Sequence, residues 1–118
     1  MRIVVLPEAA DEFEDAADYY DEQKAGLGQR YRDEVDRHIR WIAMHPDLPR
    51  IRPGGYRRVN LKVFPYYVAF VLHQHAIWVL AIAHGHRKPE HWIGRRLNLS
   101  QRDAGPNDEE RDRPPVAE

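Results

Sequence analysis

Apolar positions in the first third of the chain recur with the period of helices. A short β-branched run, residues 2–6, ends at Pro7 and predicts a strand buried on both faces. The next apolar positions recur every three or four residues, which predicts an amphipathic helix over about residues 8–23. Two glycines interrupt the pattern before a second helical stripe begins. The second stripe predicts another helix, so the two helices form a hairpin; its residues are Leu27, Tyr31, Val35, Ile39 and Ile42.

The second half of the chain changes to the period of strands. Alternation over residues 56–63 places apolar side chains on one face of a strand and Arg58 and Lys62 on the other. Two apolar runs, residues 64–72 and 76–83, predict two further strands joined as a hairpin. Helices that precede a run of strands predict an α+β fold, in which the helix hairpin packs on one face of a small, mostly antiparallel sheet.

The last part of the chain predicts a short helix followed by a tail. Pro89 suits the first turn of that helix. Beyond Leu99 the only aliphatic residue besides alanine is Val116, so residues 100–118 bury too little apolar surface to offset their ordering entropy. A chain of 118 residues fits one domain. We expect this domain to cover residues 1–99 and to be followed by a disordered acidic tail.

Charge is distributed unevenly along the chain, although the formal net charge is only −1. Residues 8–36 carry 11 acidic and 3 basic side chains, whereas residues 37–102 carry 2 acidic and 12 basic ones. The basic half predicts an anionic partner or an acidic protein segment, unless the two halves pair with each other within the fold. The acids of the first helix are interpreted as a solvated face.

Several classes of protein are excluded or disfavoured by what the sequence lacks. Cysteine is absent, which excludes disulfides, thiolate nucleophiles and iron–sulfur clusters. The apolar start is too short for a signal peptide, and no apolar run reaches the ~20 residues of a membrane-spanning helix. A soluble cytoplasmic protein is therefore expected. No nucleophile elbow, phosphate loop or dinucleotide fingerprint appears, so no cofactor is predicted.

Candidate chemistry gathers directly after the last predicted strand. Strand parity continued from Trp78 places His84, and with it His86, on one face of that strand, and Arg87 follows at its end. If this end borders the face of the two cations on the strand 56–63, the sheet carries a cationic cluster with adjacent imidazoles. Such a cluster can bind a phosphate or a carboxylate.

The same segment raises the question of a metal site. His84 and His86 have the spacing of a metal-binding pair, and His91 could be a third ligand. Carboxylates are scarce nearby, so we predict no metal. Trp92 lies at an apolar border, where a tryptophan serves either to dock the terminal helix or to contact a partner.

Five short segments occur in a characteristic order and spacing. They are Pro7-Glu-Ala, Gly26-Leu-Gly, Arg57-Arg-Val-Asn-Leu, Phe64-Pro-Tyr-Tyr-Val and His84-Gly-His-Arg-Lys-Pro-Glu-His-Trp92. Over roughly residues 3–96 the sequence thereby resembles the RelE/ParE family of type II toxin–antitoxin toxins. The resemblance implies the α+β fold predicted above, and a small cognate antitoxin whose C-terminal segment wraps the toxin.

The family divides into two branches with different chemistry. RelE-like toxins cleave mRNA on the ribosome; by this resemblance Arg58, Lys62 and Arg87 would supply charge, and His84 or His86 would move protons. ParE-like toxins inhibit DNA gyrase and need a binding surface instead of a nuclease centre. The Phe-Pro-Tyr hairpin and the His-x-x-Arg-x-Pro-x-x-Trp ending resemble the ParE branch. We therefore favour a non-enzymatic toxin that contacts gyrase or its antitoxin through Arg57, Arg58, Lys62, Arg87 and Trp92.

Overall fold

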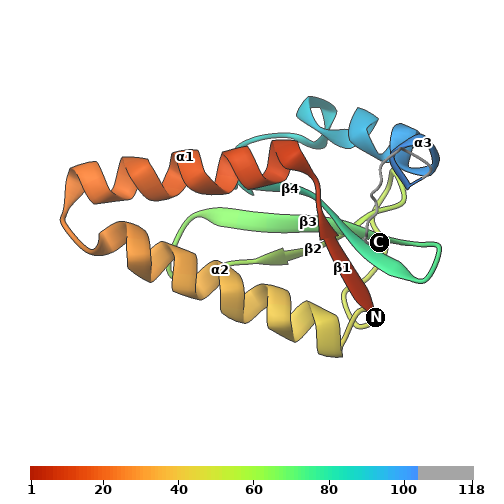
Figure 1. The fold of residues 1–118 in the computed structure, drawn as a ribbon, viewed down its shortest axis with the longest axis horizontal. Coiled ribbons are helices and arrows are strands. Elements are labelled where there is room, and N and C mark those ends of the chain that lie inside the picture. The colour runs from red at the N-terminus through yellow and green to blue at the C-terminus, as the bar shows by residue number, and fades with distance from the viewer. Residues whose placement is uncertain (104–118) are drawn as a thin grey trace.

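The computed structural model describes residues 1–103, and most of the predicted tail lies outside this part of the chain. The elements follow the predicted order (Figure 1). They are β1 (Arg2–Val5), α1 (Pro7–Gln23), α2 (Leu27–Met44), β2 (Arg57–Asn60), β3 (Tyr66–His73), β4 (Ala76–His84), the 3₁₀ turns η1 (Pro89–His91) and η2 (Ile93–Asn98), and α3 (Leu99–Asp103).

A four-stranded sheet in the order β1-β4-β3-β2 forms the centre of the molecule. β1 runs parallel to β4, and the other neighbouring strands are antiparallel. The hairpin of α1 and α2 covers one face, and the segment from η1 to α3 lies at the end of α1 where the chain begins (Figure 1). The predicted α+β fold is thus confirmed, including a mostly antiparallel sheet whose edges are β1 and β2. Within residues 1–103, no helix combines the length and apolar character needed to cross a bilayer.

The sheet carries a separate hydrophobic core on each face. Between the sheet and the helix hairpin, an aromatic group surrounds Tyr31, with ring centroids 5.7 Å from Phe13 and 5.5 Å from Phe64. On the other face, Trp92 and Leu99 from the C-terminal segment pack with strand residues. The second face is therefore covered by protein near its middle, although the alternation of β2 predicted an open face.

Two different constraints explain the two glycines that interrupt the helical pattern, a positive φ at Gly26 and close contact between α1 and α2 at Gly28. Gly26 has a φ of +88° and lies at the start of α2, a conformation that glycine adopts without steric cost. At Gly28, a Cβ would lie only 2.4 Å from the carbonyl oxygen of Ala17. The backbone N–H of Gly28 donates to Asp21 Oδ1 at 2.8 Å. Only a residue without a side chain lets the helices approach this closely.

An irregularity in the β3–β4 pairing changes which face each side chain occupies. Ala69 pairs with Ala81 and Phe70 pairs with Val79, so Leu80 has no partner opposite it. One extra residue on a strand forms a β-bulge, and residues beyond it exchange faces relative to strict alternation.

The bulge overturns the predicted position of the histidines. Trp78 packs in the core under the C-terminal segment, whereas Ile82 packs in the core under the helix hairpin. His84, two residues further on, pairs with Tyr66, which packs against that same helix-side core. His84 therefore lies on the face opposite to Trp78, because strict alternation from Trp78 does not account for the extra residue.

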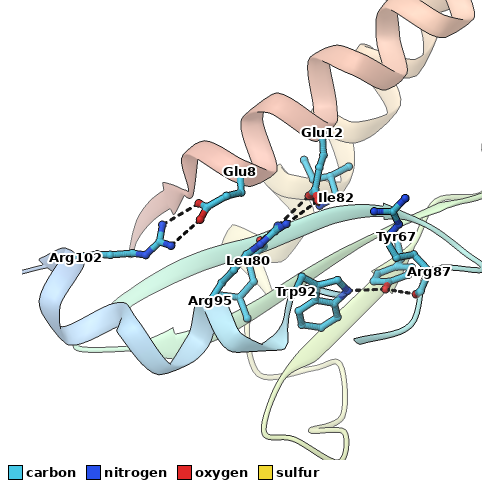
Figure 2. Close-up of polar contacts among 9 residues, drawn as sticks. All are labelled: Glu8, Glu12, Tyr67, Leu80, Ile82, Arg87, Trp92, Arg95 and Arg102. Carbon is cyan, nitrogen blue, oxygen red and sulfur yellow. Dashed lines mark hydrogen bonds and ion pairs between the residues drawn. The ribbon is translucent and has the colours of Figure 1, made fainter. Parts of the chain in front are cut away.

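Two ion pairs tie the C-terminal segment to α1 (Figure 2). Arg102 donates to both carboxylate oxygens of Glu8, at 2.9 and 2.7 Å. Arg95 donates to both oxygens of Glu12, at 3.2 and 3.0 Å, and to the carbonyl oxygen of Leu80 at 2.8 Å. The interpretation of the α1 acids as a solvated face is therefore wrong for Glu8 and Glu12, since the fold pairs them with distant arginines.

Candidate partner-binding surfaces

The buried side chain of Tyr67 on β3 contacts three of the predicted site residues, of which Figure 2 shows Arg87 and Trp92. Its hydroxyl donates to the carbonyl oxygen of Arg87 at 2.7 Å and accepts from Trp92 Nε1 at 2.8 Å. The guanidinium carbon of Arg58 lies 4.1 Å from the centre of the Tyr67 ring, a cation–π contact of about 0.5–1 kcal/mol. Burial raises the pKa of Tyr67 above its ordinary value, although the hydrogen bond from Trp92 and the positive charge of Arg58 act to lower it. Tyr67 thus fixes the backbone that carries Arg87.

Two predicted contact residues instead stabilise the fold. Trp92 is only 1% exposed and packs edge-to-face on Tyr56, with ring centroids 4.7 Å apart. It docks the C-terminal segment and has no surface to offer a partner. Arg57 Nη1 donates at 2.8 Å to the carbonyl oxygens of Asp47 and Pro49. Its guanidinium therefore holds the loop between α2 and β2, because two carbonyl oxygens of that loop accept from it.

Lys62 lies outside β2, because the strand ends at Asn60 and the predicted alternation stops there. The buried carboxylate of Glu34, 2% exposed, accepts from the backbone N–H groups of Lys62 and Val63. This contact holds the loop after β2 against α2. The sequence offered no signal for it, since an acid beside the apolar stripe of a helix usually faces solvent.

His84 and His86 lie with Arg87 at the end of β4 that faces α1. The rings of His84 and His86 stack with centroids 5.1 Å apart, and His84 Nδ1 accepts from the His86 backbone N–H at 3.1 Å. His84 and Arg87 line a recess of about 350 Å³ together with Tyr19 and Tyr66. The structure thus brings His84, His86 and Arg87 together. Within the described residues, no three His, Asp or Glu side chains are placed to hold a metal ion.

Arg58 does not join this histidine group. Its partner across the strands is Ala69, which packs on the face of the C-terminal segment, whereas His84 pairs with Tyr66 on the helix face. The Arg58 and His84 side chains therefore leave the sheet from opposite faces. The predicted cluster, in which both would share one face beside a single phosphate, is not formed.

A largely apolar groove with a volume of about 730 Å³ lies between α2 and the free edge of β2. Three exposed apolar side chains line it, and its cations are Arg37, Arg58 and Lys62; the apolar residues are Trp41, Leu48 and Val63. We call this surface the α2–β2 groove. Sequence reasoning missed it, because Trp41 lies one residue off the buried stripe of α2, and Leu48 lies in a loop.

The β2 edge adds unpaired backbone groups to the α2–β2 groove. The backbone N–H of Leu61 donates to the carbonyl oxygen of Tyr66 at 2.9 Å. In an antiparallel pair, alternate residues bond to the neighbouring strand, so the peptide groups of Arg58 and Asn60 point away from β3. An edge of this kind accepts an added strand or polar side chains from another protein.

Comparisons with known proteins agree with this architecture. The profile of a family described as the ParE toxin of the type II toxin–antitoxin system, parDE, matches residues 3–89. Among solved structures, the chain is similar in fold to the chromosomal ParDE toxin–antitoxin system from P. aeruginosa, with a TM-score of 0.54 and 18% identity over 71% of this chain and 95% of that chain. A search of curated proteins found no significant relative. Because the profile spans more than half of the sequence, the chain belongs to the ParE toxins of type II toxin–antitoxin systems.

Proposed function

We propose that this ParE-family toxin inhibits DNA gyrase in the cytoplasm and is neutralised by a cognate antitoxin. The placement of Arg58 and His84 on opposite faces of the sheet supports this proposal over mRNA cleavage. An RNA-cleaving centre needs a base, an acid and cations around one phosphate. A gyrase inhibitor needs only an exposed binding surface, for which Arg87 and its neighbours on the β4 end are available.

We propose that the antitoxin occupies the α2–β2 groove. Apolar anchors of an antitoxin segment would bury Trp41, Leu48 and Val63, and its acids would meet the cations Arg37 and Lys62 at the rim. The outward peptide groups of β2 would be satisfied by the same segment. This combination of apolar centre and cationic rim fits an acidic, amphipathic peptide.

A supercoiling assay tests the target. Purified toxin is expected to block supercoiling by gyrase in the absence of ribosomes. The substitutions His84→Gln and His86→Gln are expected to have small effects, because no proton transfer is catalysed, whereas Arg87→Ala weakens inhibition through lost contacts. Primer extension on translated mRNA is run in parallel. Cleavage of mRNA with unimpaired gyrase would overturn the proposal. In that case the loss of a histidine that acts as acid or base should lower the rate of mRNA cleavage by roughly 10²–10⁴.

The same assay tests the antitoxin site. The toxin and the product of its neighbouring gene are mixed before gyrase is added, which should restore supercoiling. Leu48→Asp, in the α2–β2 groove, should leave inhibition intact but raise the antitoxin needed by at least about tenfold, the effect of roughly 1.4 kcal/mol of lost binding. Val5→Asp is the matched control, because Val5 is also an exposed aliphatic residue but lies on β1, at the opposite edge of the sheet from β2. Equal behaviour of the two variants would place the antitoxin elsewhere.

A further inference from the structure

A cluster of arginines surrounds the turn that precedes β2. The backbone N–H of Arg52 donates to the carbonyl oxygen of Tyr56 at 2.7 Å, and Gly55 N–H donates back to the Arg52 carbonyl oxygen at 2.9 Å. The C-terminal segment packs on this turn, at the end of the molecule that carries α3 (Figure 1). A Cβ at Gly55 would lie 2.9 Å from Arg96 Nη2. The Arg96 guanidinium therefore lies against the turn formed by Arg52.

The charges in this region are not balanced by acids. Burial lowers the pKa of Arg52 below its ordinary value, and the nearby positive charges of Arg58 and Arg50 lower it further. Over residues 1–103, no carboxylate lies within ion-pair distance of Arg50, Arg52, Arg58 or Arg96, the four residues that we call the arginine cluster. Like charges held together without acids oppose folding through repulsion.

Two other arginines within residues 1–103 have their charges neutralised by carboxylates. Arg95 pairs with Glu12 and Arg102 pairs with Glu8, each through two hydrogen bonds. These pairs lie on α1, where acids are abundant. The arginine cluster lies where residues 1–103 place no pairing acid, so an external anion would relieve its repulsion.

A recess lies beside the cluster and can admit an anionic group. Its volume is about 360 Å³, and it lies between the turn, the end of β3 and the C-terminal segment. Arg96, Gly55 and His73 are among its lining residues. A glycine backbone at the rim permits close approach of a ligand, and a guanidinium offers paired N–H donors to phosphate oxygens.

We propose that the arginine cluster binds the phosphates of nucleic acid, and that the toxin thereby contacts the DNA duplex held by gyrase. The first statement, binding of phosphates, follows from the cluster alone. The second statement, contact with DNA held by gyrase, rests on the proposed function. A polyanion suits the cluster because it places several charges along one surface, whereas a single carboxylate would leave most of the four cations unneutralised. The recognition is independent of base sequence, since only phosphates are contacted.

Salt dependence of binding tests the first statement. Fluorescence anisotropy with a labelled duplex of random sequence gives the dissociation constant at several salt concentrations. Each phosphate contact contributes about −0.9 to the slope of log K against log salt, so four contacts give roughly −3 to −4. The triple variant Arg50→Gln/Arg52→Gln/Arg96→Gln should lose about 2–3 of this slope. The variant Arg30→Gln/Arg37→Gln/Arg40→Gln removes the same charge from α2 and should keep the wild-type slope.

The results separate the inference from the proposed function. Absence of duplex binding at low salt, or the same slope in both triple variants, overturns the arginine cluster as a phosphate site even if wild-type toxin inhibits gyrase. Cluster-dependent DNA binding by a toxin that does not inhibit gyrase leaves the phosphate site intact and overturns the gyrase proposal. Binding of single-stranded RNA but not duplex DNA would overturn the assignment to DNA. Circular dichroism spectra of both variants check that each is folded.

Discussion

Two buried tyrosines show how differently the same residue type can serve this fold. Tyr31 and Tyr67 are both 0% exposed. The hydroxyl of Tyr67 has two partners, whereas that of Tyr31 has no hydrogen-bond partner among the described residues. Burial raises the pKa of Tyr31 far above its ordinary value, with Tyr66 and Tyr20 adding to the effect. Tyr31 therefore contributes its ring to the core and pays a desolvation penalty for its hydroxyl.

We expect the substitutions Tyr31→Phe and Tyr67→Phe to have opposite consequences. Tyr31→Phe removes an unpaired polar group, so the free energy of unfolding should stay equal or rise by up to about 1 kcal/mol. Tyr67→Phe leaves the N–H of Trp92 and the carbonyl of Arg87 without a partner. This substitution should lower the free energy of unfolding by about 1–3 kcal/mol. Urea unfolding followed by tryptophan fluorescence measures both. Destabilisation by Tyr31→Phe would reveal a partner for that hydroxyl outside residues 1–103.

Residue types alone could identify the charged and aromatic candidates but not which of them the fold uses internally. Arg57 and Trp92 have the chemistry of contact residues, and both are committed to internal hydrogen bonds. Those partners lie 8, 10 and 25 positions away in sequence. No local pattern encodes such distances, because they depend on how loops return to the sheet.

At the scale of elements, periodicity predicted β1, α1, α2, β2, β3 and β4 in the correct order, whereas α3 falls mostly in residues that were assigned to the tail. The helical stripes and the apolar strands have strong, local signals. The bulge at Leu80 and the early end of β2 at Asn60 were not predictable. A bulge depends on the partner strand, and the end of β2 depends on Glu34, which is 28 residues from Lys62. The bulge accounts for the separation of Arg58 from His84, and the early end of β2 accounts for the position of Lys62 outside the strand.

The link between α1 and α3 should weaken in acid. Hydrogen bonds from Arg102 lower the pKa of Glu8 from 4.5 to about 2. A carboxyl whose pKa is depressed by folding stabilises the protein fully above its unfolded pKa, and this contribution is lost as the pH falls toward 2. Wild type should therefore be more stable than Arg102→Gln at pH 6, with the difference shrinking between pH 4.5 and 2. Glu8 is 41% exposed, so the difference should stay below about 1 kcal/mol.

Urea unfolding at pH 6, 4, 3 and 2 measures this difference. Glu8→Gln is the matched control, because it removes the titrating carboxylate and keeps the size of the side chain. The two single variants and the double variant should show the same pH dependence. A wild-type advantage that stays constant down to pH 2 would mean that Arg102 acts through packing and not through the Glu8 charge.

For the whole molecule, the melting temperatures of truncated chains test where the folded domain ends. The sequence predicted a domain that ends at residue 99, and the structure continues as the helix α3 to Asp103. Truncation after residue 103 should change the melting temperature by no more than about 1 °C. Truncation after Asn98 removes the buried Leu99 and the Arg102 ion pair, so we expect a loss of about 2–3 kcal/mol and a fall of several degrees. Thermal unfolding monitored by circular dichroism compares them, and equal melting temperatures would show that α3 does not stabilise the fold.

The contacts that close this fold join its first and last parts, and this has a consequence for its synthesis. The described sheet pairs β1 only with β4, and the Glu8–Arg102 and Glu12–Arg95 pairs span 94 and 83 residues. A nascent chain emerges from its N-terminus at about 5–20 residues per second. The first strand and helix therefore wait exposed for several seconds until the residues that cover them have been made. The contacts between the first and last parts of this fold thus form only after almost the whole described chain has been synthesised.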